Sequence, residues 1–413
     1  MNLLRRARFA LAGALPDQST LRHDGTAGTA AVAGVEPGNT VDIVILPIID
    51  WDFRFQRPQQ LASSLADAGH RVFYLATRFR AGGPAFEITG KRHNLFEVSL
   101  RGPAHNIYTD TMDTAASDAL FTSLNELRVA TGLGAAALLV ELPFWWPLAA
   151  TARRELAWPV VYDCMDLHSG FSTNRPAMVE QEQALLIGAD LVVVSSAMLE
   201  REAAGHARRV EVIRNGCDFE HFSAVPGHRP GRRPVIGYVG AIADWFDADL
   251  VADLAERRPD WDFLLIGSTY TASDRRLRRL PNVTMPGEQP YDSLPSWIER
   301  FDVAIIPFRR VPLTEATNPV KAYEMLASGK PVVAVPIPEV ARLAPLVRLA
   351  STASEMEVEI LAALAEDDPA RAAARREFAA ANTWQHRTAQ LVSALDGCFP
   401  LASIISSRSP ASR

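Results

Sequence analysis

The sequence of 413 residues predicts an α/β protein with two Rossmann-like domains, each built on a doubly wound parallel sheet, that face each other across a cleft. Short β-branched apolar runs alternate with longer segments of helical period, which is typical of parallel strands joined by helices. The alternation stops in the Pro, Gly and Arg-rich stretch AVPGHRPGRRP (residues 224–234) and then starts again. Hydrophobic residues make up 48% of the chain and charged residues 22%, which is enough for two buried cores.

The first half contains near-continuous apolar runs, which indicate strands buried on both faces of a sheet. Its helices are recognised by their ends: the segment 57–69 has Pro58 near its start and Gly69 at its end. By the same criteria we expect strands at residues 41–49, 71–77, 136–143, 159–164, 191–196 and 210–216, with helices such as residues 176–189 between them.

The second half repeats this pattern from Val235 onward and ends in helices between about residues 354 and 397. Ligands of such sheets bind at the carboxyl ends of the strands, so the loops that follow the strands are the places to search for a site. We expect strands at residues 235–242, 262–268, 282–287, 302–308 and 331–336, and helices at residues 248–259, 294–301 and 319–328.

One helix of the second half carries an unusual pair of charges. Asn318 is expected to cap it, Pro319 to occupy its first helical position and Gly329 to end it. Lys321 and Glu324 are three residues apart and therefore share one side of the helix. The helix is otherwise apolar, so we expect the pair to line a cleft rather than to form a solvated surface pair.

The expected domain organisation follows from these patterns. A disordered tail at each end encloses two sheet domains, a linker and a final helix that we expect to pack back on the first domain. The predicted segments are the N-terminal tail 1–39, the first domain 40–222, the linker 223–234, the second domain 235–382, the final helix 383–399 and the C-terminal tail 400–413.

Composition excludes several classes of protein. The net charge of −6 gives no basic field for nucleic acid. The three cysteines, Cys164, Cys217 and Cys398, are widely spaced, as in a reduced cytoplasmic protein, and suggest neither a disulfide framework nor a metal site. No apolar run is long enough for a membrane span. The basic start MNLLRRARFALAG is a candidate for peripheral contact with the inner face of a membrane rather than a secretory signal.

Two loops of the first half carry candidate functional residues. Asp50, Trp51, Arg54 and Arg57 crowd one loop that opens a helix, where arginines and helix amides could bind an anion or an acceptor. The letters D-x-D at Asp50 to Asp52 are interpreted as coincidence, so we predict no metal.

The second of these loops, YDCMDLHSGF, follows a buried strand and holds Asp163, Asp166 and His168. Such groups suit acid/base work or the binding of a sugar hydroxyl. A purely structural role for the histidine is the alternative.

Two stretches of the second half suggest a nucleotide diphosphate. Gly240 follows a strand, where backbone amides could approach phosphates. The stretch is not a G-x-G-x-x-G fingerprint, so a dinucleotide dehydrogenase is excluded. Lys321 offers positive charge, and Glu324 offers a carboxylate for paired hydroxyls such as a ribose diol.

These motifs together resemble glycosyltransferases of the GT-B fold, and in particular bacterial family-four-like enzymes that transfer sugars to cell-surface polysaccharides. The resemblance covers residues 41 to 397. Its most specific parts are RPQQLASSLADAGHRVFYL, VYDCMD, ADLVVVSSAML, VEVIRNGCDFEHF, GYVGAIADWFD and NPVKAYEMLASGKPVVA.

The resemblance implies a nucleotide-sugar donor held mainly by the second domain, a glycan or lipid-linked acceptor, retention of configuration, and no cofactor or metal. Glu324 would bind the ribose. His168 and Asp166 would be catalytic, and the loop from Asp50 to Arg57 would meet the acceptor or a phosphate. The remaining residues implied in donor binding are Gly240, Arg214, Thr317, Asn318 and Lys321 near the diphosphate, and Gln289, Tyr291 and Leu294 near the base.

Two departures from the family pattern leave alternatives open. Ala316 stands where the family's first glutamate is expected, with Glu315 or Asn318 as substitutes. The usual Arg and Lys after the second-domain glycine are absent, with Arg214, Arg309 or Arg310 as substitutes. The alternatives to a transferase are therefore a nucleotide-sugar epimerase of the same architecture and a catalytically inactive nucleotide- or glycan-binding subunit.

Overall fold

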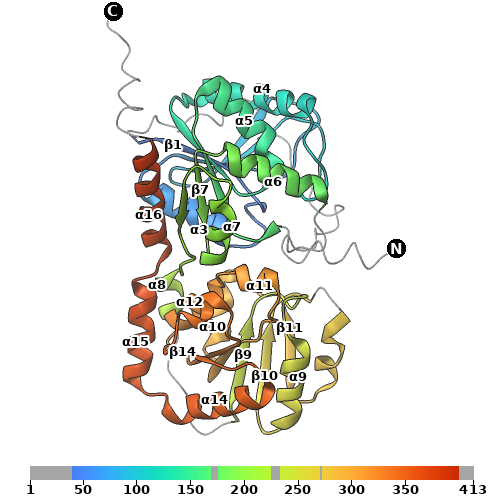
Figure 1. Cartoon of the computed structure of the whole chain (residues 1–413), viewed down its shortest axis with the longest axis vertical. Coiled ribbons are helices and arrows are strands. Elements are labelled where there is room, and N and C mark those ends of the chain that lie inside the picture. The colour runs from blue at the N-terminus through green and yellow to red at the C-terminus, as the bar shows by residue number, and fades with distance from the viewer. Residues whose placement is uncertain (1–39, 169–174, 225–232, 270–271, 400–413) are drawn as a thin grey trace, which may run out of the picture. The chain divides into compact units, whose positions relative to one another are not determined.

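The computed structural model describes residues 40–168, 175–224, 233–269 and 272–399. The predicted tails 1–39 and 400–413, and residues 225–232 of the predicted linker, lie outside the described residues. The described chain divides into two compact units (Figure 1). The N-terminal unit comprises residues 40–213 and 388–399, and the C-terminal unit comprises residues 214–387.

The N-terminal unit is built on an eight-stranded sheet of order β3-β4-β2-β1-β5-β6-β7-β8. Every neighbouring pair is parallel except β3 and β4. The chain order reverses between β1 and β5, which makes their carboxyl ends the switch point where ligands of such sheets bind. The strands are β1 (Asp42–Leu46), β2 (Val72–Leu75), β3 (Phe86–Arg92), β4 (Leu95–Leu100), β5 (Ala136–Val140), β6 (Val160–Cys164), β7 (Leu191–Val194) and β8 (Val210–Val212).

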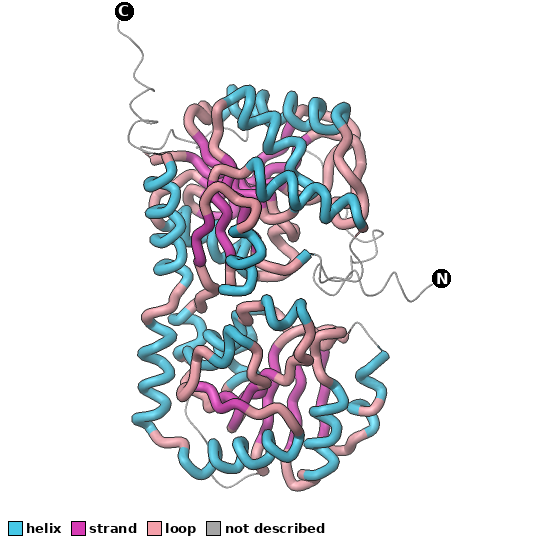
Figure 2. Tube along the Cα trace, viewed as in Figure 1, coloured by secondary structure: helices cyan, strands magenta, loops and turns pink. Residues whose placement is uncertain are grey.

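Helices lie on both faces of this sheet, as the cyan and magenta tubes of Figure 2 show. Their ends follow local chemistry: the longest helix begins after Asp113, whose side chain accepts from Ala116 N at 2.8 Å, and ends at Gly132, where φ is +63°. The helices are α3 (Arg57–Asp67), α4 (Thr114–Thr131), α5 (Trp146–Leu156), α6 (Pro176–Gly188) and α7 (Ala197–Ala204), with the 3₁₀ turn η2 (Pro143–Trp145).

The antiparallel hairpin of β3 and β4 is a feature that the apolar-run criterion does not predict. Its strands alternate apolar and polar residues, because β3 is an edge strand with one face in solvent. The tight turn between the strands contains Asn94 with φ +59°, a left-handed conformation that asparagine tolerates. An antiparallel edge on an otherwise parallel sheet is common in α/β folds.

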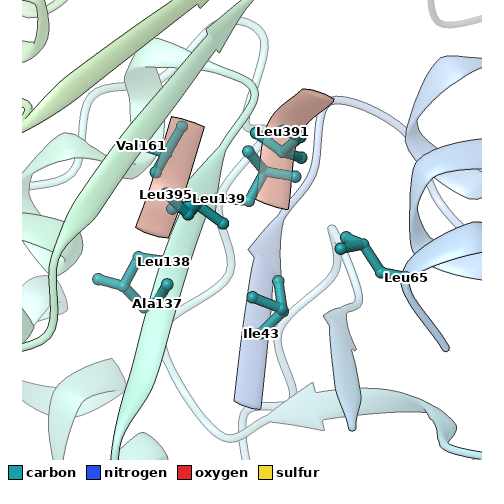
Figure 3. Close-up of a pocket in the computed structure, with 8 residues that line it drawn as sticks. All are labelled: Ile43, Leu65, Ala137, Leu138, Leu139, Val161, Leu391 and Leu395. Atoms are coloured by element: carbon teal, nitrogen blue, oxygen red, sulfur yellow. The ribbon is translucent and has the colours of Figure 1, made fainter. Parts of the chain in front are cut away.

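The final helix α16 (Trp384–Cys398) completes the core of the N-terminal unit. Its residues from Thr388 onward group with this unit, and Leu391, Ala394 and Leu395 are buried in the same cluster as Ile43. A small apolar pocket remains beside Leu391 and Leu395, which Figure 3 shows with the strand residues that line it. The helix is therefore an integral part of this core.

The C-terminal unit contains a six-stranded, fully parallel sheet of order β11-β10-β9-β12-β13-β14. Its switch point lies between β9 and β12, where the chain order reverses. The strands are β9 (Val235–Val239), β10 (Asp262–Ile266), β11 (Val283–Gly287), β12 (Val303–Ile306), β13 (Val332–Ala334) and β14 (Val347–Leu349).

The helices of the C-terminal unit pack against this sheet and against one another, and the buried faces form one apolar cluster. They are α8 (Phe219–Ser223), α9 (Ala248–Arg257), α10 (Leu294–Ile298), α11 (Pro312–Ala316), α12 (Val320–Ala327), α13 (Pro338–Ala341), α14 (Ala353–Glu366) and α15 (Pro369–Ala380), with the 3₁₀ turns η4 (Ala272–Arg275), η5 (Leu277–Arg279) and η6 (Tyr291–Ser293).

The start of α12 differs from the prediction in one respect. The helix begins at Val320 and Pro319 is its N-cap, without a side-chain capping bond. The prediction that Asn318 caps this helix is therefore wrong. The physical reason is a competing partner, because the Asn318 side chain is bound to Asn215 instead. The predicted C-terminal end is confirmed, since Gly329 adopts φ +75°.

The predicted fold class, two α/β units with parallel-dominated sheets, is confirmed. In the described part of the chain, no helix has both the length and the apolar character needed to cross a bilayer.

Candidate functional site

Two glycines build the turn at the end of β9 in the C-terminal unit. Gly240 follows β9 with φ +146°, and Gly267 follows β10 with φ +150°. A Cβ atom on Gly267 would lie 1.9 Å from the Gly240 carbonyl oxygen, so no other residue fits there. Gly240 N donates to Ile266 O at 2.9 Å and fixes the turn. The result is a bare stretch of main chain at the switch point, suited to close approach by a ligand.

Lys321 lies over this turn. A Cβ atom on Gly240 would lie 2.8 Å from Lys321 Cε, so the lysine stem occupies the space that the glycine leaves. The Nζ atom lies 4.8 Å from the centre of the Phe308 ring and 5.9 Å from that of Tyr238. Burial lowers the pKa of Lys321 to about 8, and the nearby Glu324 acts in the opposite direction. A half-buried ammonium group is thus held at the β9/β12 switch point.

Glu324 stands on the same side of α12, one turn further on. It is half-buried, and burial raises its pKa to about 7. Lys321 lowers that pKa and Asp218 adds to the rise. A lysine can donate to phosphate oxygens while an ionised carboxylate accepts from paired hydroxyls, so the pair can recognise a phosphorylated sugar or nucleoside.

Asn318 is buried and bound to the protein itself. Its Oδ1 accepts from Asn215 N at 2.9 Å, and its Nδ2 donates to Tyr323 Oη at 3.2 Å and to Glu339 Oε2 at 3.3 Å. These bonds fix the segment that leads into α12. They also engage both polar atoms of the side chain that was a candidate for the diphosphate.

Two of the arginines considered as phosphate ligands are paired within the unit. Arg214 Nε donates to Glu339 Oε2 at 2.7 Å, and that glutamate is 2% exposed. Arg310 lies 3.3 Å from Glu315. The Nη2 atom of Arg309 lies 3.9 Å from the Asp249 carboxylate.

The position expected for a glutamate, Ala316, is fully buried in α11. Glu315 beside it is half-buried and forms the ion pair with Arg310. Thr317 donates through Oγ1 to Leu313 O at 2.7 Å, so its hydroxyl serves the end of α11. The two replacements considered for the glutamate are thus engaged elsewhere, Glu315 with Arg310 and Asn318 with Asn215.

The three residues predicted near the base all follow β11. Gln289 donates through Nε2 to Pro286 O at 3.3 Å, and Leu294 is the first residue of α10. The Tyr291 ring stacks on His221 with centres 4.6 Å apart and an angle of 8° between planes. His221, which lies on the separate helix α8, was not predicted as a site residue, although it belongs to the motif VEVIRNGCDFEHF.

In the N-terminal unit, Arg57 forms a buried bidentate ion pair with Asp163. Its Nε and Nη2 atoms donate to the two carboxylate oxygens at 2.8 and 2.7 Å, and both side chains are at most 3% exposed. Burial acts to lower the pKa of the guanidinium, but the carboxylates around it outweigh that effect and the pKa is raised. The positive charge predicted to meet a ligand is thus matched inside the protein.

Glu141 belongs to the same cluster and was missed by the sequence analysis. It follows β5 directly, is 1% exposed, and accepts from Ile48 N at 3.3 Å through Oε2. Burial and the Asp163 carboxylate raise the pKa of Glu141 well above its ordinary value, against the opposing effects of Ile48 N–H and Arg57. The available signal was an acidic residue directly after the apolar run AALLV.

Asp166 and His168 follow β6 at the same edge of the sheet. Asp166 is half-buried, and burial raises its pKa to about 6, although Arg57 lowers it and Asp163 raises it further. His168 is 5% exposed, and burial lowers its pKa to about 4. At pH 7 the aspartate is therefore mostly ionised and the histidine neutral. Both can bind a hydroxyl, and residues 169–174 after them lie outside the described residues.

The loop after β1 is held by side chains from other elements. Five consecutive backbone carbonyls, those of residues 47 to 51, each accept a hydrogen bond from a side chain. These bonds fix the conformation of the main chain in this loop. The donors are Trp145 Nε1 to Pro47 O (2.8 Å), Tyr108 Oη to Ile48 O (2.5 Å), Tyr74 Oη to Ile49 O (2.6 Å), and Gln59 Nε2 to Asp50 O (3.1 Å) and to Trp51 O (3.3 Å).

The side chains of this loop have separate partners. Asp50 Oδ1 accepts from Thr77 N at 2.9 Å and Oγ1 at 2.6 Å, whereas Asp52 pairs with Lys91 at 2.9 Å. Trp51 lies edge-on to Tyr74 with ring centres 5.3 Å apart. The Arg54 guanidinium lies 4.9 Å from the Phe53 ring centre. The two carboxylates of D-x-D therefore bind different partners. No group of three metal-binding side chains occurs among the described residues.

Comparisons with known proteins give consistent matches for both units. Residues 56–216 match the family model described as "Glycosyl transferase 4-like domain", and residues 233–366 match "Glycosyl transferases group 1". The putative teichuronic acid biosynthesis glycosyltransferase TuaH of Bacillus subtilis (strain 168) is 31% identical over 207 residues, which cover 45% of this chain and 52% of TuaH. The match thus spans about half the length of this curated relative.

Similar solved structures share the fold over nearly their whole length. The sucrose-phosphate synthase of Thermosynechococcus elongatus has a TM-score of 0.68 at 17% identity, covering 87% of this chain and 99% of that chain. Anabaena HepE, solved with UDP and glucose, has a TM-score of 0.64 at 17% identity, covering 86% and 99%. The starch synthase IV catalytic domain of Arabidopsis thaliana, bound to ADP and acarbose, has 0.63 at 11%, covering 89% and 99%.

Proposed function

This chain belongs to the family-four-like glycosyltransferases of the GT-B fold, and on that premise we propose that it transfers a sugar from a nucleoside-diphosphate sugar to a glycan or lipid-linked acceptor. The likeness to TuaH, which is named for teichuronic acid biosynthesis, supports a role in the synthesis of a cell-surface polysaccharide.

One observation carries the proposal, namely the position of Lys321 over Gly240 with Glu324 on the same side of α12. When the glycosidic bond to the diphosphate breaks, negative charge grows on the leaving group, and a fixed ammonium beside bare main chain can stabilise it. Glu324 would accept hydrogen bonds from the ribose hydroxyls. We propose uridine diphosphate as the leaving group, because two similar proteins are named as a complex with UDP and as UDP-forming, against one named as bound to ADP.

Two finer features are part of the proposal. Transfer without a metal is supported by the lysine and the backbone amides, which can balance the diphosphate charge themselves. Retention of configuration is supported by the family and by a similar trehalose-6-phosphate synthase described as an enzyme of glycosyl transfer with retention. In the N-terminal unit, Asp166 and the neutral His168 would bind hydroxyls of the transferred sugar or the acceptor.

A nucleotide-binding subunit without transferase activity is the second candidate. Buried Ala316 favours it, because no carboxylate can come from that position and Glu315 is paired with Arg310. The two candidates share nucleotide binding and differ in turnover.

The test is calorimetric titration of the full chain with UDP, GDP, ADP and TDP, first without metal and then with magnesium. UDP is expected to bind most tightly, with an affinity that magnesium leaves unchanged. Glu324→Ala is expected to weaken UDP binding by about 1.5–3 kcal/mol, the contribution of hydrogen bonds to a charged group. Glu315→Ala, on the neighbouring helix, is the control and is expected to bind UDP as the wild type does.

Two results would reject the assignment: equal affinity of wild type and Glu324→Ala for UDP, or binding of none of the four nucleotides. UDP binding without release of UDP from UDP-sugars, tested across a panel of glycan acceptors, would favour the inactive subunit instead.

A further inference from the structure

Glu141 and Asp163 are lateral neighbours on one face of the N-terminal sheet. Strands β5 and β6 are paired in parallel with Leu139 opposite Val161 and Val140 opposite Tyr162. Continuing this register by one residue places Glu141 beside Asp163. Alternate residues of a strand point to the same face, so Glu141 shares the face of Leu139. Because β5 is next to β1, this carboxyl pair lies at the switch point of the sheet.

The charges of this site disfavour the binding of an anion. Arg57 is the guanidinium of the cluster, and its Nε and Nη2 atoms, which form one edge of the group, both donate to Asp163. Glu141 and Asp166 are further carboxyl groups close enough to act on the pKa of Arg57. A phosphate or carboxylate entering here would be repelled by the ionised Asp166 beside the Arg57–Asp163 pair, whereas an uncharged hydroxyl would not be.

One carboxyl oxygen of the cluster lacks a partner. Glu141 Oε2 accepts from Ile48 N, but Oε1 is enclosed and has no hydrogen bond to any residue that the structure describes. An unmatched buried polar atom destabilises a fold by about 1–3 kcal/mol, so its retention calls for a partner that a ligand could supply. Burial and the Asp163 carboxylate raise the pKa of this acid well above its ordinary value. In its protonated form a carboxyl group offers one donor and one acceptor, the pattern that a sugar hydroxyl matches.

We propose that Glu141 binds a hydroxyl of an uncharged sugar at the β1/β5 switch point, so that this site takes a neutral, polyhydroxylated acceptor and not a phosphorylated one. The identification of that sugar as the acceptor rests on the proposed function. Asp166, half-buried at the same edge, provides the second contact.

The test uses ligand-observed NMR on the full chain with methyl α-D-glucopyranoside, methyl α-D-galactopyranoside, methyl N-acetyl-α-D-glucosaminide and glucose 6-phosphate, with and without UDP. At least one neutral glycoside is expected to bind, and glucose 6-phosphate more weakly. Glu141→Gln keeps a donor and an acceptor and is expected to bind within about threefold of wild type. Glu141→Met removes both and is expected to bind about tenfold more weakly, the loss of one net hydrogen bond.

The two variants also have readouts that do not depend on sugar binding. UDP affinity is expected to be unchanged in both, which shows that the C-terminal unit is intact. The infrared band of protonated carboxyl groups is expected to be weaker at pH 7 in Glu141→Gln than in wild type, because other acids such as Glu324 still contribute to it.

Three outcomes would overturn the inference: tighter binding of glucose 6-phosphate than of every neutral glycoside, equal binding by wild type and Glu141→Met, or no binding of any neutral glycoside. Failure of UDP to bind would reject the proposed nucleotide site, but it would leave the sugar measurements interpretable.

Discussion

The two sheets of this protein place opposite chemistry at equivalent points. In the C-terminal unit the chain order reverses between β9 and β12, and the ammonium of Lys321 lies there over a glycine turn. In the N-terminal unit the order reverses between β1 and β5, and the carboxyl group of Glu141 lies there beside an ion pair that is already complete.

On the two proposals above, topology would set where a ligand binds, and a few side chains would set which ligand. A parallel sheet supplies the crevice in both units. The ammonium group of Lys321 can interact with phosphate. In the N-terminal unit, Asp163 neutralises the charge of Arg57, and Asp166 adds a further negative charge. Removing the charge of Arg57 at the N-terminal switch point should therefore affect mainly stability. Removing the charge of Lys321 at the C-terminal switch point should affect mainly nucleotide binding.

The largest effect is expected for Arg57→Met. Removing one partner of a buried ion pair leaves Asp163 charged and unpaired, which should lower the free energy of unfolding by about 3–5 kcal/mol. Denaturation in urea measures it. UDP affinity of the folded variant is expected to remain that of the wild type.

Two controls sharpen that prediction. Arg154→Met removes an exposed partner of Glu155 and is expected to change stability by less than about 0.5 kcal/mol. Replacing both members, in Arg57→Met with Asp163→Leu, is expected to recover much of the loss, because a buried pair can be exchanged for apolar contacts. A double variant as unstable as the single one would contradict the ion-pair explanation.

Gly267→Ala is expected to be next in size. The new Cβ would clash with the Gly240 carbonyl at a positive φ, and strain and overpacking together should amount to about 2–4 kcal/mol. UDP binding should be lost as the turn distorts. Gly287→Ala is the control, since φ there is +84° but no atom lies within 4 Å. Similar losses in both variants would show that backbone strain alone matters.

Lys321→Met tests the switch point of the C-terminal unit directly. It is expected to weaken UDP binding by about 1.5–3 kcal/mol at pH 7, with little effect on folding. In the wild type, affinity should fall as pH rises above about 8, because the protonated lysine is the binding form and its pKa is about 8. The variant should lack this alkaline decline. Calorimetry between pH 6 and pH 9.5 would compare the two, with Lys91→Met as a control in the N-terminal unit.

The smallest effect, per pH unit, is a change in how the stability of Glu141→Gln depends on pH. The raised pKa of Glu141 means that the folded state binds a proton that the unfolded state releases above its ordinary value of 4.5. Wild-type stability should therefore decrease as pH rises from there, by at most about 1.4 kcal/mol per pH unit for one proton. The charged or titratable groups that face it are Arg57, Asp163 and Tyr74.

Thermal unfolding between pH 5 and pH 8 would measure this slope, which should be flatter in Glu141→Gln. Exposed Glu126→Gln is the control and is expected to keep the wild-type slope. Identical slopes in all three proteins would mean that Glu141 is ionised in the folded state.

Much of the fold was predictable because its strands are buried on both faces. Apolar runs such as those of β1 and β7 stand out in the sequence, and the linker composition separates the two halves. The β3–β4 hairpin was not predicted, because its exposed edge strand is half polar. Local patterns identify buried elements more readily than exposed ones.

The site was predictable where one helix carries it and not where distant residues compete. Lys321 and Glu324 lie close in sequence, so helical spacing alone placed them together. The engagement of Arg57 by Asp163 joins residues 106 positions apart, and that of Asn318 by Asn215 joins residues 103 positions apart. Local sequence patterns therefore suggested that Arg57 and Asn318 were available to a ligand, whereas the fold pairs them with Asp163 and Asn215.

The five carbonyls held after β1 have a consequence for how this protein could change over generations. The donors that hold the loop, such as Trp145, Tyr74 and Gln59, donate to main-chain oxygens and not to its side chains. A replacement of an exposed side chain beside them, such as that of Asp52, therefore removes none of these bonds. Natural or laboratory selection can thus vary the exposed side chains of this loop without having to rediscover its conformation.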